Sequence, residues 1–571
     1  MRYALRIAGL CYKAFRRSVK PLGRLKACEN KKIEADMAAF DTDYLIIGSG
    51  FGGSVSALRL AQKGYRVLVV EQGRRFAPRD MPESTRNLRR FLWLPSLFCR
   101  GFFSLRLFRH MLVLHGNAVG GGSVVYANTL LVPPEKVWRS GTWALLRDWA
   151  AEMPGHYRTA EKMLGVTTNP LLADADYMLK KLADEAGVGG SFYRTRVAVY
   201  FGADDEHAQP QQQGDPYFAG KGPARAPCIG CGGCMVGCRH RAKNSLDYNY
   251  LYLAEKLGAK VLAESSVSRI EPLDKQDKGH TGWRVTVQPF KQPEQHFTAQ
   301  NVIVSAGSLG TQALLFDMKE KGVLPDLSPA LGRNVFTNAE SLIGVRFPGG
   351  SADFSRGIAI GSGIHLADGT HIEATRFPAG SNIASLLGTL MNHSRAGRMN
   401  LRQWLGAFAR GWLTRPWQMW QALRPKNMAR ESLIFLCMQT APQPLNMVWR
   451  RPWFWPWRRR LASEGARIPA YIPAAGEFAF QAAQAHGGSA FSCVADVFLN
   501  IPATAHCMGG AALAASPEEG VCDAQHRVFG YQNLYVIDGA NISANLGVNP
   551  SLTITALAEA AISHIPPKEC L

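Results

Sequence analysis

The stretch "DYLIIGSGFGGSVSALRLAQKGYRVLVVEQG", residues 43–73, decides the fold class. Its apolar runs "YLII" and "YRVLVV" are typical of parallel strands that are covered on both faces. Between the two runs, Gly48, Gly50 and Gly53 have the G-x-G-x-x-G spacing. These glycines permit a tight turn, the close approach of a pyrophosphate and the packing of a helix on the strand. The stretch therefore predicts a Rossmann-like strand–helix–strand unit.

The rest of the stretch agrees with a dinucleotide site. We expect a helix over residues 52–62, with phosphates bound at its N-terminus and Gly64 at its end. Glu71 follows the second strand, at the place where an acidic residue binds ribose hydroxyls. The motif predicts a bound dinucleotide but does not distinguish FAD from NAD.

A second glycine-rich segment, "HGNAVGGGSVVYAN" at residues 115–128, has Gly120, Gly121, Gly122 and Ser123 in a row. Backbone without Cβ atoms can lie against a flat ligand, so this segment is a candidate part of the cofactor site.

A third segment, "NLYVIDGANISANLGVNPSLTITALAEAA" at residues 533–561, has the pattern of a strand, a turn and a helix. The run "LYVID" predicts a buried strand that ends at Asp538, and Gly539 predicts the turn. We expect the helix to begin at Pro550 with Asn549 as its N-cap.

Taken together, these segments resemble the glucose–methanol–choline (GMC) oxidoreductases, which bind FAD, and within that family the cholesterol oxidase branch. The resemblance extends over nearly the whole chain from about residue 41. The blocks that carry it are "GSGFGG" (48–53), "VGGGS" (119–123), "HIEATRFPAG" (371–380), "AHCMGG" (505–510), "VIDGANI" (536–542) and "GVNPSLTITALAE" (547–559).

The resemblance implies an α/β fold with a discontinuous, Rossmann-like FAD-binding domain and an α+β substrate-binding domain. It also implies that Val267, in "VLAESSVSRI", contacts the adenine end of the cofactor. The expected division is a basic segment at 1–40, a FAD domain from 41–135, 225–340 and 500–571, and a substrate domain from 136–224 and 341–499.

The same resemblance indicates the reacting groups. His506 falls on the family position that binds the substrate hydroxyl, and Asn549 on the position whose amide meets both hydroxyl and flavin. Histidine suits proton transfer because its ordinary pKa is near 6.5. Glu373 matches the glutamate that moves a proton during steroid double-bond migration; the alternative is a surface glutamate in an irregular segment, beside the cationic Arg376.

One position departs from the family pattern. Cholesterol oxidases have an asparagine near the flavin where this chain has Tyr126, and we expect Asn128 to take its place in the cofactor site.

Cys228, Cys231, Cys234 and Cys238 have the C-x2-C-x2-C-x3-C spacing of bacterial ferredoxins. The spacing favours one iron–sulfur cluster held by these four cysteines, and the alternatives are a loop without metal and a zinc ion. Arg239 in place of the usual proline and the lack of a second cysteine run weaken the match to ferredoxins.

The formal charge of +21 does not indicate nucleic acid, because the basic residues stand among Trp, Phe and Leu. Residues 86–116 and 449–460 show this mixture most clearly, which suits peripheral contact with an anionic membrane or the edges of ordinary core helices. Residues 91–114 and 401–423 are predicted to cover an apolar substrate. With no secretory signal and scattered cysteines, we expect a cytoplasmic protein, with membrane-surface association as an alternative.

The resemblance implies FAD-dependent oxidation of a sterol 3β-hydroxyl group to the ketone, with double-bond isomerisation through Glu373. A second hypothesis is a FAD/iron–sulfur dehydrogenase of another apolar alcohol. The electron acceptor is oxygen in the first case and a quinone or protein carrier in the second. A third hypothesis, of another class, is a flavin electron-transfer protein without alcohol chemistry.

Overall fold

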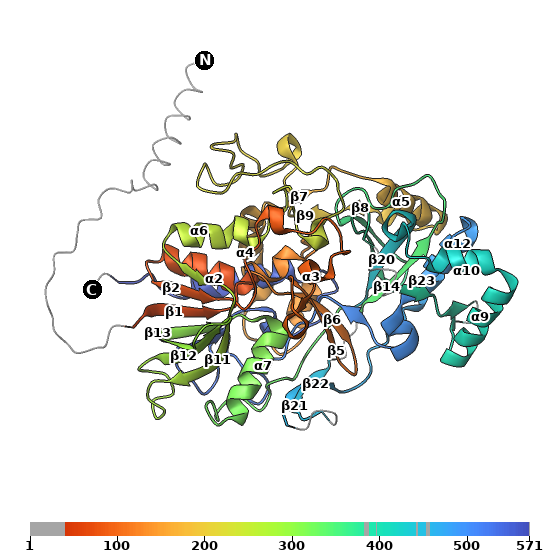
Figure 1. Ribbon diagram of the computed structural model, residues 1–571. Coiled ribbons are helices and arrows are strands. Elements are labelled where there is room, and N and C mark those ends of the chain that lie inside the picture. Colours follow the sequence, from red (N-terminus) through yellow and green to blue (C-terminus); the bar gives the residue numbers. More distant parts are fainter. Residues whose placement is uncertain (1–39, 382–387, 395–396, 441–443, 453–456, 570–571) are drawn as a thin grey trace, which may run out of the picture. The chain divides into compact units, whose positions relative to one another are not determined.

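The computed structural model describes residues 40–381, 388–394, 397–440, 444–452 and 457–569. Residues Phe40–Pro567 form one compact unit (Figure 1).

The first sheet has the mixed topology of a dinucleotide-binding fold. Its strand order is β10-β2-β1-β13-β12-β11, and β25 also pairs with β13. The pairs β10–β2, β2–β1, β1–β13 and β13–β25 are parallel, whereas β11, β12 and β13 form an antiparallel meander. The strands are β1 (Thr42–Ile47), β2 (Val67–Val70), β10 (Lys260–Leu262), β11 (Ser265–Pro272), β12 (Trp283–Pro289), β13 (Gln295–Val304) and β25 (Leu534–Val536).

Helix α2 (Phe51–Gln62) connects β1 to β2, so the predicted strand–helix–strand unit is confirmed, with the helix starting one residue earlier. It packs with α6 (Tyr250–Lys256) and α13 (Ser551–Ser563), and α13 packs in turn on α4 (Trp149–Leu164). In Figure 1, α2 and α6 lie above β1 and β2, and α7 (Gly307–Glu320) lies to the right of β11, which it contacts. All residues of β1 and β2 are buried, as expected for apolar strands that are covered on both faces.

One helix boundary differs from the sequence prediction. The N-cap of α13 is Pro550, not Asn549, and the helix begins at Ser551. The asparagine thus lies one residue outside the helix, where its side chain is available for a tertiary contact.

The second sheet is antiparallel among its long strands and has the order β17-β23-β14-β20-β16-β15-β8. Helices α5 (Asp174–Glu185) and α12 (Pro473–Ala485) share an apolar cluster with it. The strands are β8 (Tyr193–Arg194), β14 (Ser341–Arg346), β15 (Ile360–His365), β16 (His371–Thr375), β17 (Gly388–Leu390), β20 (Ser432–Met438) and β23 (Ser489–Cys493).

Alternation along these strands sets the two faces of the sheet. On β16, Ile372 and Ala374 join the apolar cluster with the helices, so Glu373 must point to the opposite face. On β20, Leu433 and Phe435 join the same cluster, whereas Leu436 lines a cavity on the other side. The second sheet thus presents one face to its helices and one to the cavity.

Each strand of the first sheet comes from the ranges expected for the FAD domain, and each strand of the second from the ranges expected for the substrate domain. Residues 91–114 include the hairpin of β5 (Phe103–Leu107) and β6 (Leu112–Gly116), which reaches the cavity. By contrast, 401–423 form α9 (Leu401–Thr414) and α10 (Pro416–Leu423), which line no part of this cavity. Their predicted role as a direct cover of the cavity is therefore wrong.

No helix in the described ranges is long and apolar enough to cross a bilayer.

Candidate active site

A cavity of about 1350 Å³ extends from the glycine turn after β1 to the open face of the second sheet. Both predicted regions, the dinucleotide site and the reacting groups, contribute to its wall. The predicted site residues that line it are Gly48, Gly50, Glu71, Gly121, Gly122, Val267, Asp538, Gly539, His506 and Asn549.

The glycine turn leaves room for a ligand at the end of β1. A Cβ atom on Gly50 would meet no atom of the chain, so the backbone there faces open space. Gly48 has φ +102°, and its Cβ would lie 2.3 Å from the carbonyl oxygen of Ser305. Gly121 approaches Gly50 so closely that its Cβ would lie 2.6 Å from the Gly50 Cα. The two glycine-rich segments predicted from the sequence therefore meet across one concave backbone surface.

Glu71 closes this end of the cavity. Its carboxylate accepts hydrogen bonds from the Ser49 amide at 2.9 Å and from the Gly73 amide at 2.8 Å. Burial raises the pKa of Glu71, and these amide bonds oppose the change. Val267, on β11, lines the same cavity.

Asp538 lies at the C-terminal side of β25 and is held on both oxygens. It accepts from Thr311 Oγ1 at 2.6 Å, from the Gly307 amide at 2.9 Å and from the Ala540 amide at 2.8 Å. Burial raises its pKa to about 6. The residue therefore fixes the turn at Gly539 that borders the cavity.

Other predicted cofactor residues lie behind the cavity wall. Gly53 allows α2 to approach β1, since a Cβ there would lie 2.0 Å from the Gly48 oxygen. Ser123 donates to the Gly120 oxygen at 2.6 Å and accepts from the Leu246 amide. Asn128 is fully buried outside the lining, while Tyr126 lines the cavity and donates to the Asn244 oxygen.

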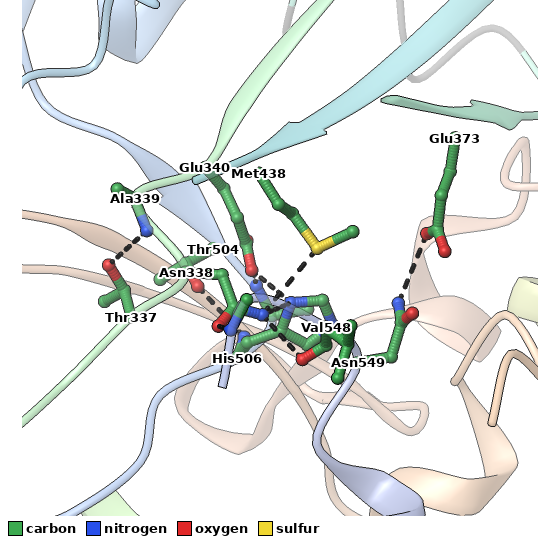
Figure 2. A network of polar contacts seen from close by, with 12 residues as sticks. Thr337, Asn338, Ala339, Glu340, Glu373, Met438, Thr504, His506, Val548 and Asn549 are labelled. Atoms are coloured by element: carbon green, nitrogen blue, oxygen red, sulfur yellow. Dashed lines mark hydrogen bonds and ion pairs between the residues drawn. The ribbon is translucent and has the colours of Figure 1, made fainter. Parts of the chain in front are cut away.

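His506 follows strand β24 (Ala503–Thr504) and is 8% exposed. Its Nδ1 atom contacts the Oε1 atom of Glu340, and Nδ2 of Asn338 lies 3.1 Å from the same nitrogen (Figure 2). Nε2 is therefore the ring nitrogen left for a bound molecule. Burial alone lowers the pKa of His506, but the carboxylate of Glu340 and, more weakly, that of Glu373 outweigh it, so the pKa is raised.

Glu340 is itself held in place. The side chain is 1% exposed, and its Oε2 atom accepts a hydrogen bond from the Ala505 amide at 3.1 Å. Asn338 is oriented by the Val548 oxygen, to which it donates at 2.9 Å, and by the Gly547 amide. The segment whose two side chains contact the imidazole thus lies more than 160 residues before His506 in the sequence.

Asn549 and Glu373 form the second polar pair of the site. The Nδ2 atom of Asn549 donates to Oε2 of Glu373 at 3.3 Å (Figure 2). Asn549 Oδ1 and Glu373 Oε1 are buried without a hydrogen-bond partner among the described residues. Buried polar atoms are rarely left unpaired, and Asn549 lines the cavity, so its oxygen is available to a bound ligand. Glu373 lies outside the cavity lining and meets it through Asn549.

The surroundings of Glu373 move its protonation equilibrium into the neutral pH range. The side chain is fully buried, and burial raises its pKa to about 7 against the Asn549 hydrogen bond and the charge of His506. His371 Nε2 lies 3.8 Å from Glu373 Oε1, and burial lowers the pKa of this histidine to about 3. A neutral histidine gives the carboxyl group little charge compensation, so Glu373 can change protonation state in the neutral range.

The four clustered cysteines form no metal-binding group in the described part of the chain. Burial raises the pKa of Cys228 to about 12 and also raises that of Cys231 and Cys234, which favours the neutral thiol. Lys243 Nζ ties this loop to the glycine-rich segment by donating to the oxygens of Cys234, Val124 and Tyr126 at 2.8–2.9 Å. The structure thus gives the cysteine loop a packing contact with the cofactor segment and no support for an iron–sulfur cluster.

Comparison with known proteins identifies the family to which this chain belongs. Models of the GMC oxidoreductase family match residues 225–338 and 458–558, and a model of an NAD(P)-binding Rossmann-like domain matches residues 46–107. A cholesterol oxidase of Acinetobacter baumannii is 50% identical over 93% of this chain and 96% of its own length. The chain belongs to the GMC oxidoreductase family.

Two further relatives extend the comparison of this GMC oxidoreductase. A cholesterol oxidase of Mycobacterium tuberculosis is 42% identical over 92% of each chain. The crystal structure of pyridoxine 4-oxidase from Mesorbium loti has a TM-score of 0.58 at 14% identity, covering 92% of this chain and 99% of that one, which shows a shared fold.

FAD fits the residues present. The backbone at Gly50 faces open space beside Gly121 in the cavity wall, Glu71 stands at the end of β2, and Asn549 offers an unpaired buried oxygen in the same wall. This enzyme is therefore a flavoprotein that acts on CH–OH groups, as its family membership implies.

Sequence reasoning missed Glu340 and Asn338. Both stand in "VFTNAESLIG", whose pattern shows only a loop followed by a strand. The sequence shows only a glutamate immediately before an apolar strand. This pattern does not indicate a functional residue unless the position of His506 beside it is known.

Proposed function

We propose that the protein oxidises the 3β-hydroxyl group of a sterol to the ketone and then moves the ring double bond into conjugation. The observation that carries this proposal is the contact of His506 Nδ1 with buried Glu340, which aims the second ring nitrogen toward a cavity with apolar walls. The names of the relatives with 50% and 42% identity support a sterol as the substrate.

The cavity walls suit a rigid hydrocarbon. Side chains from the second sheet and its connections form an apolar chamber next to His506, namely Leu342, Ile360, Phe377, Ile434, Leu436 and Phe491. Burying a sterol against these side chains supplies binding energy that does not depend on the reacting hydroxyl.

His506 acts as the base of the oxidation. In the neutral imidazole, the Nδ1 proton is donated to Glu340, so Nε2 accepts the hydroxyl proton. The carboxylate then stabilises the imidazolium that forms. Bound FAD supplies the acceptor for the hydride that leaves the same carbon. Asn549, at the cavity edge, orients the hydroxyl oxygen.

Glu373 serves the second step. As a carboxylate it takes a proton from the carbon between the ketone and the double bond, and as a carboxylic acid it returns that proton to the far carbon of the double bond. With a pKa of about 7, both forms are accessible at neutral pH. Its unpaired Oε1 atom is the oxygen free to carry the proton.

Oxygen is the proposed electron acceptor, supported by the oxidase names of the relatives. A dehydrogenase that passes electrons through an iron–sulfur cluster gains no support from the cysteine loop of the described chain. The nine described cysteines are free thiols, which supports the proposed cytoplasmic location.

The test is to incubate the purified, FAD-loaded protein with cholesterol in air and to follow hydrogen peroxide and the steroid product. The proposal expects one peroxide per ketone formed and a conjugated enone as the final product. Flavin reduction by the sterol without peroxide would overturn the choice of oxygen. A lack of any flavin reduction by sterols would overturn the substrate.

A further inference from the structure

Helices α9 and α10 form a hairpin at the margin of the second sheet, beyond α12 and β23 in Figure 1. Only Trp404 and Met419 are buried among their residues. Most of the large apolar side chains of the hairpin are instead exposed. We call the exposed set the hairpin patch: Leu401, Leu405, Trp412, Leu413, Trp417 and Trp420.

The exposure of the hairpin patch is unusual for a soluble surface. Leu413 is 84% exposed, Trp417 67% and Trp420 53%. Scattered apolar residues need no explanation, but six exposed apolar side chains on two contacting helices, three of them tryptophans, mark an interaction site. Outside the hairpin, Phe498 adds to the apolar surface. Its ring centroid lies 5.1 Å from that of Trp404, and its side chain is 46% exposed.

The charge around the patch has one sign. Residues 388–430 contain no aspartate or glutamate, whereas Arg402, Arg410 and Arg415 lie exposed on the hairpin. None of these three arginines forms an ion pair with another residue that the structure describes. Such a surface is complementary to a partner that is both apolar and negatively charged.

The base of the hairpin is rigid. Arg346 on β14 is 1% exposed and donates to the oxygens of Ala422, in the last turn of α10, and of Arg424 and Lys426, just past its end. It also pairs with Glu431 at 2.7 Å. Because these bonds hold the end of α10 to the sheet, the exposure of the hairpin patch is built into the fold.

The hairpin also touches the wall of the active-site cavity. Trp404 Nε1 donates to the Leu390 oxygen at 2.9 Å, and Leu390 ends strand β17. Gly388, two residues earlier on this edge strand, lines the cavity. A partner bound to the hairpin would therefore lie close to one wall of the substrate chamber.

We propose that the hairpin patch docks the protein on the surface of an anionic phospholipid bilayer. Tryptophan settles at headgroup depth, leucine reaches the acyl chains, and arginine pairs with phosphate. A role in taking sterol from that bilayer rests on the proposed function, whereas the docking itself does not. A second copy of the chain is a poorer partner for the hairpin patch, because it would bring positive charges together. Residues 1–39 are poorer for the same reason, since their charged residues are mainly basic.

The experiment is co-sedimentation of the full-length, FAD-loaded protein with sterol-free vesicles of phosphatidylcholine, with and without phosphatidylglycerol. We expect binding to the anionic vesicles that weakens at high salt. The triple variant Leu413→Ser/Trp417→Ser/Trp420→Ser is expected to lose at least ~10-fold in partition coefficient. A matched control, Leu145→Ser/Tyr177→Ser/Leu257→Ser, changes three residues that are 98%, 62% and 54% exposed elsewhere and should bind as before.

The charge component has its own pair of variants. The variant Arg402→Gln/Arg410→Gln/Arg415→Gln should bind the anionic vesicles at least ~10-fold more weakly, because each basic side chain near an anionic membrane surface contributes to the free energy of binding. Lys136→Gln/Arg158→Gln/Lys221→Gln removes the same charge from other exposed positions and should have a smaller effect.

Several results would overturn the proposal. One is equal binding by the apolar triple variant and its control. Another is loss of binding on deletion of residues 1–39 with no effect of the hairpin variants. A third is a dimer in sedimentation velocity that the triple variant abolishes. Turnover of sterol delivered by cyclodextrin separates the proposed sterol oxidation from the proposed membrane docking, because it tests the chemistry without a membrane.

Discussion

Glu340 Oε1 contacts His506 Nδ1, and both side chains are almost completely buried. This contact fixes which ring nitrogen of the histidine meets a substrate and raises the pKa of the imidazole. It makes Glu340 a positioning residue, since it acts on the reaction through His506.

Replacing Glu340 by Gln tests that role. The imidazole loses the neighbouring negative charge, so its pKa falls, and it stays neutral to lower pH. Since only neutral His506 accepts a proton, the acid limb of the kcat/KM profile should move down by about one pH unit. At high pH the rate should fall ~10-fold, because the imidazolium loses its stabilising charge.

The matched control is Glu320→Gln, which alters a glutamate at the cavity rim that pairs with Arg459. Its pH profile should match that of the unaltered enzyme. An unmoved acid limb in Glu340→Gln, with FAD still bound, would show that Glu340 has only a structural role.

Glu373→Gln should separate the two proposed steps. Ketone formation should continue, while appearance of the conjugated enone should slow by ~100-fold or more, because the proton carrier is lost. In the unaltered enzyme, the first proton transfer needs the carboxylate, so the isomerisation rate should rise with pH through about 7. Chromatography of the two ketones over time measures both steps, and equal slowing of both would contradict the assignment.

Lys243→Met tests the tie between the cysteine loop and the glycine-rich segment. Burial lowers the pKa of Lys243 to about 7, and its Nζ atom serves three carbonyl oxygens. Leaving these oxygens unpaired should lower the free energy of unfolding by ~3 kcal/mol and weaken FAD retention. Lys319→Met is the control, because Lys319 binds two carbonyl oxygens in a more exposed position. This replacement should lower the free energy of unfolding by less than Lys243→Met does. Equal losses measured by denaturant unfolding would contradict this account.

The cysteine loop predicts a negative result in metal analysis. Protein purified without oxygen should contain no stoichiometric iron or acid-labile sulfide, and Cys231→Ser/Cys238→Ser should retain FAD. Iron and sulfide in stoichiometric amounts, lost in this variant, would restore the dehydrogenase hypothesis.

The local parts of the fold were predictable from the sequence because they depend on short-range patterns. The apolar runs and glycines of 43–73 specify β1, α2 and β2 directly. The end of the chain was predicted less well, because Asn549 has the chemistry of an N-cap and yet donates to Glu373 instead.

The site was predictable only where a motif marked it. His506 and Glu373 stand in blocks that resemble a known family, whereas Glu340 gains its meaning from a contact across 166 residues. The helices of 401–423 have the composition of a substrate cover, but their attachment through Trp404 and Arg346 places them outside the cavity. Tertiary contacts of this kind leave no local trace in a sequence.

The most direct test of the central claim is stopped-flow reduction of the flavin by cholesterol without oxygen, comparing the unaltered enzyme with His506→Gln. The account predicts that both proteins bind FAD and that the variant flavin is reduced at least ~100-fold more slowly. Reduction at the same rate in both would contradict the claim that His506, held by Glu340, takes the hydroxyl proton.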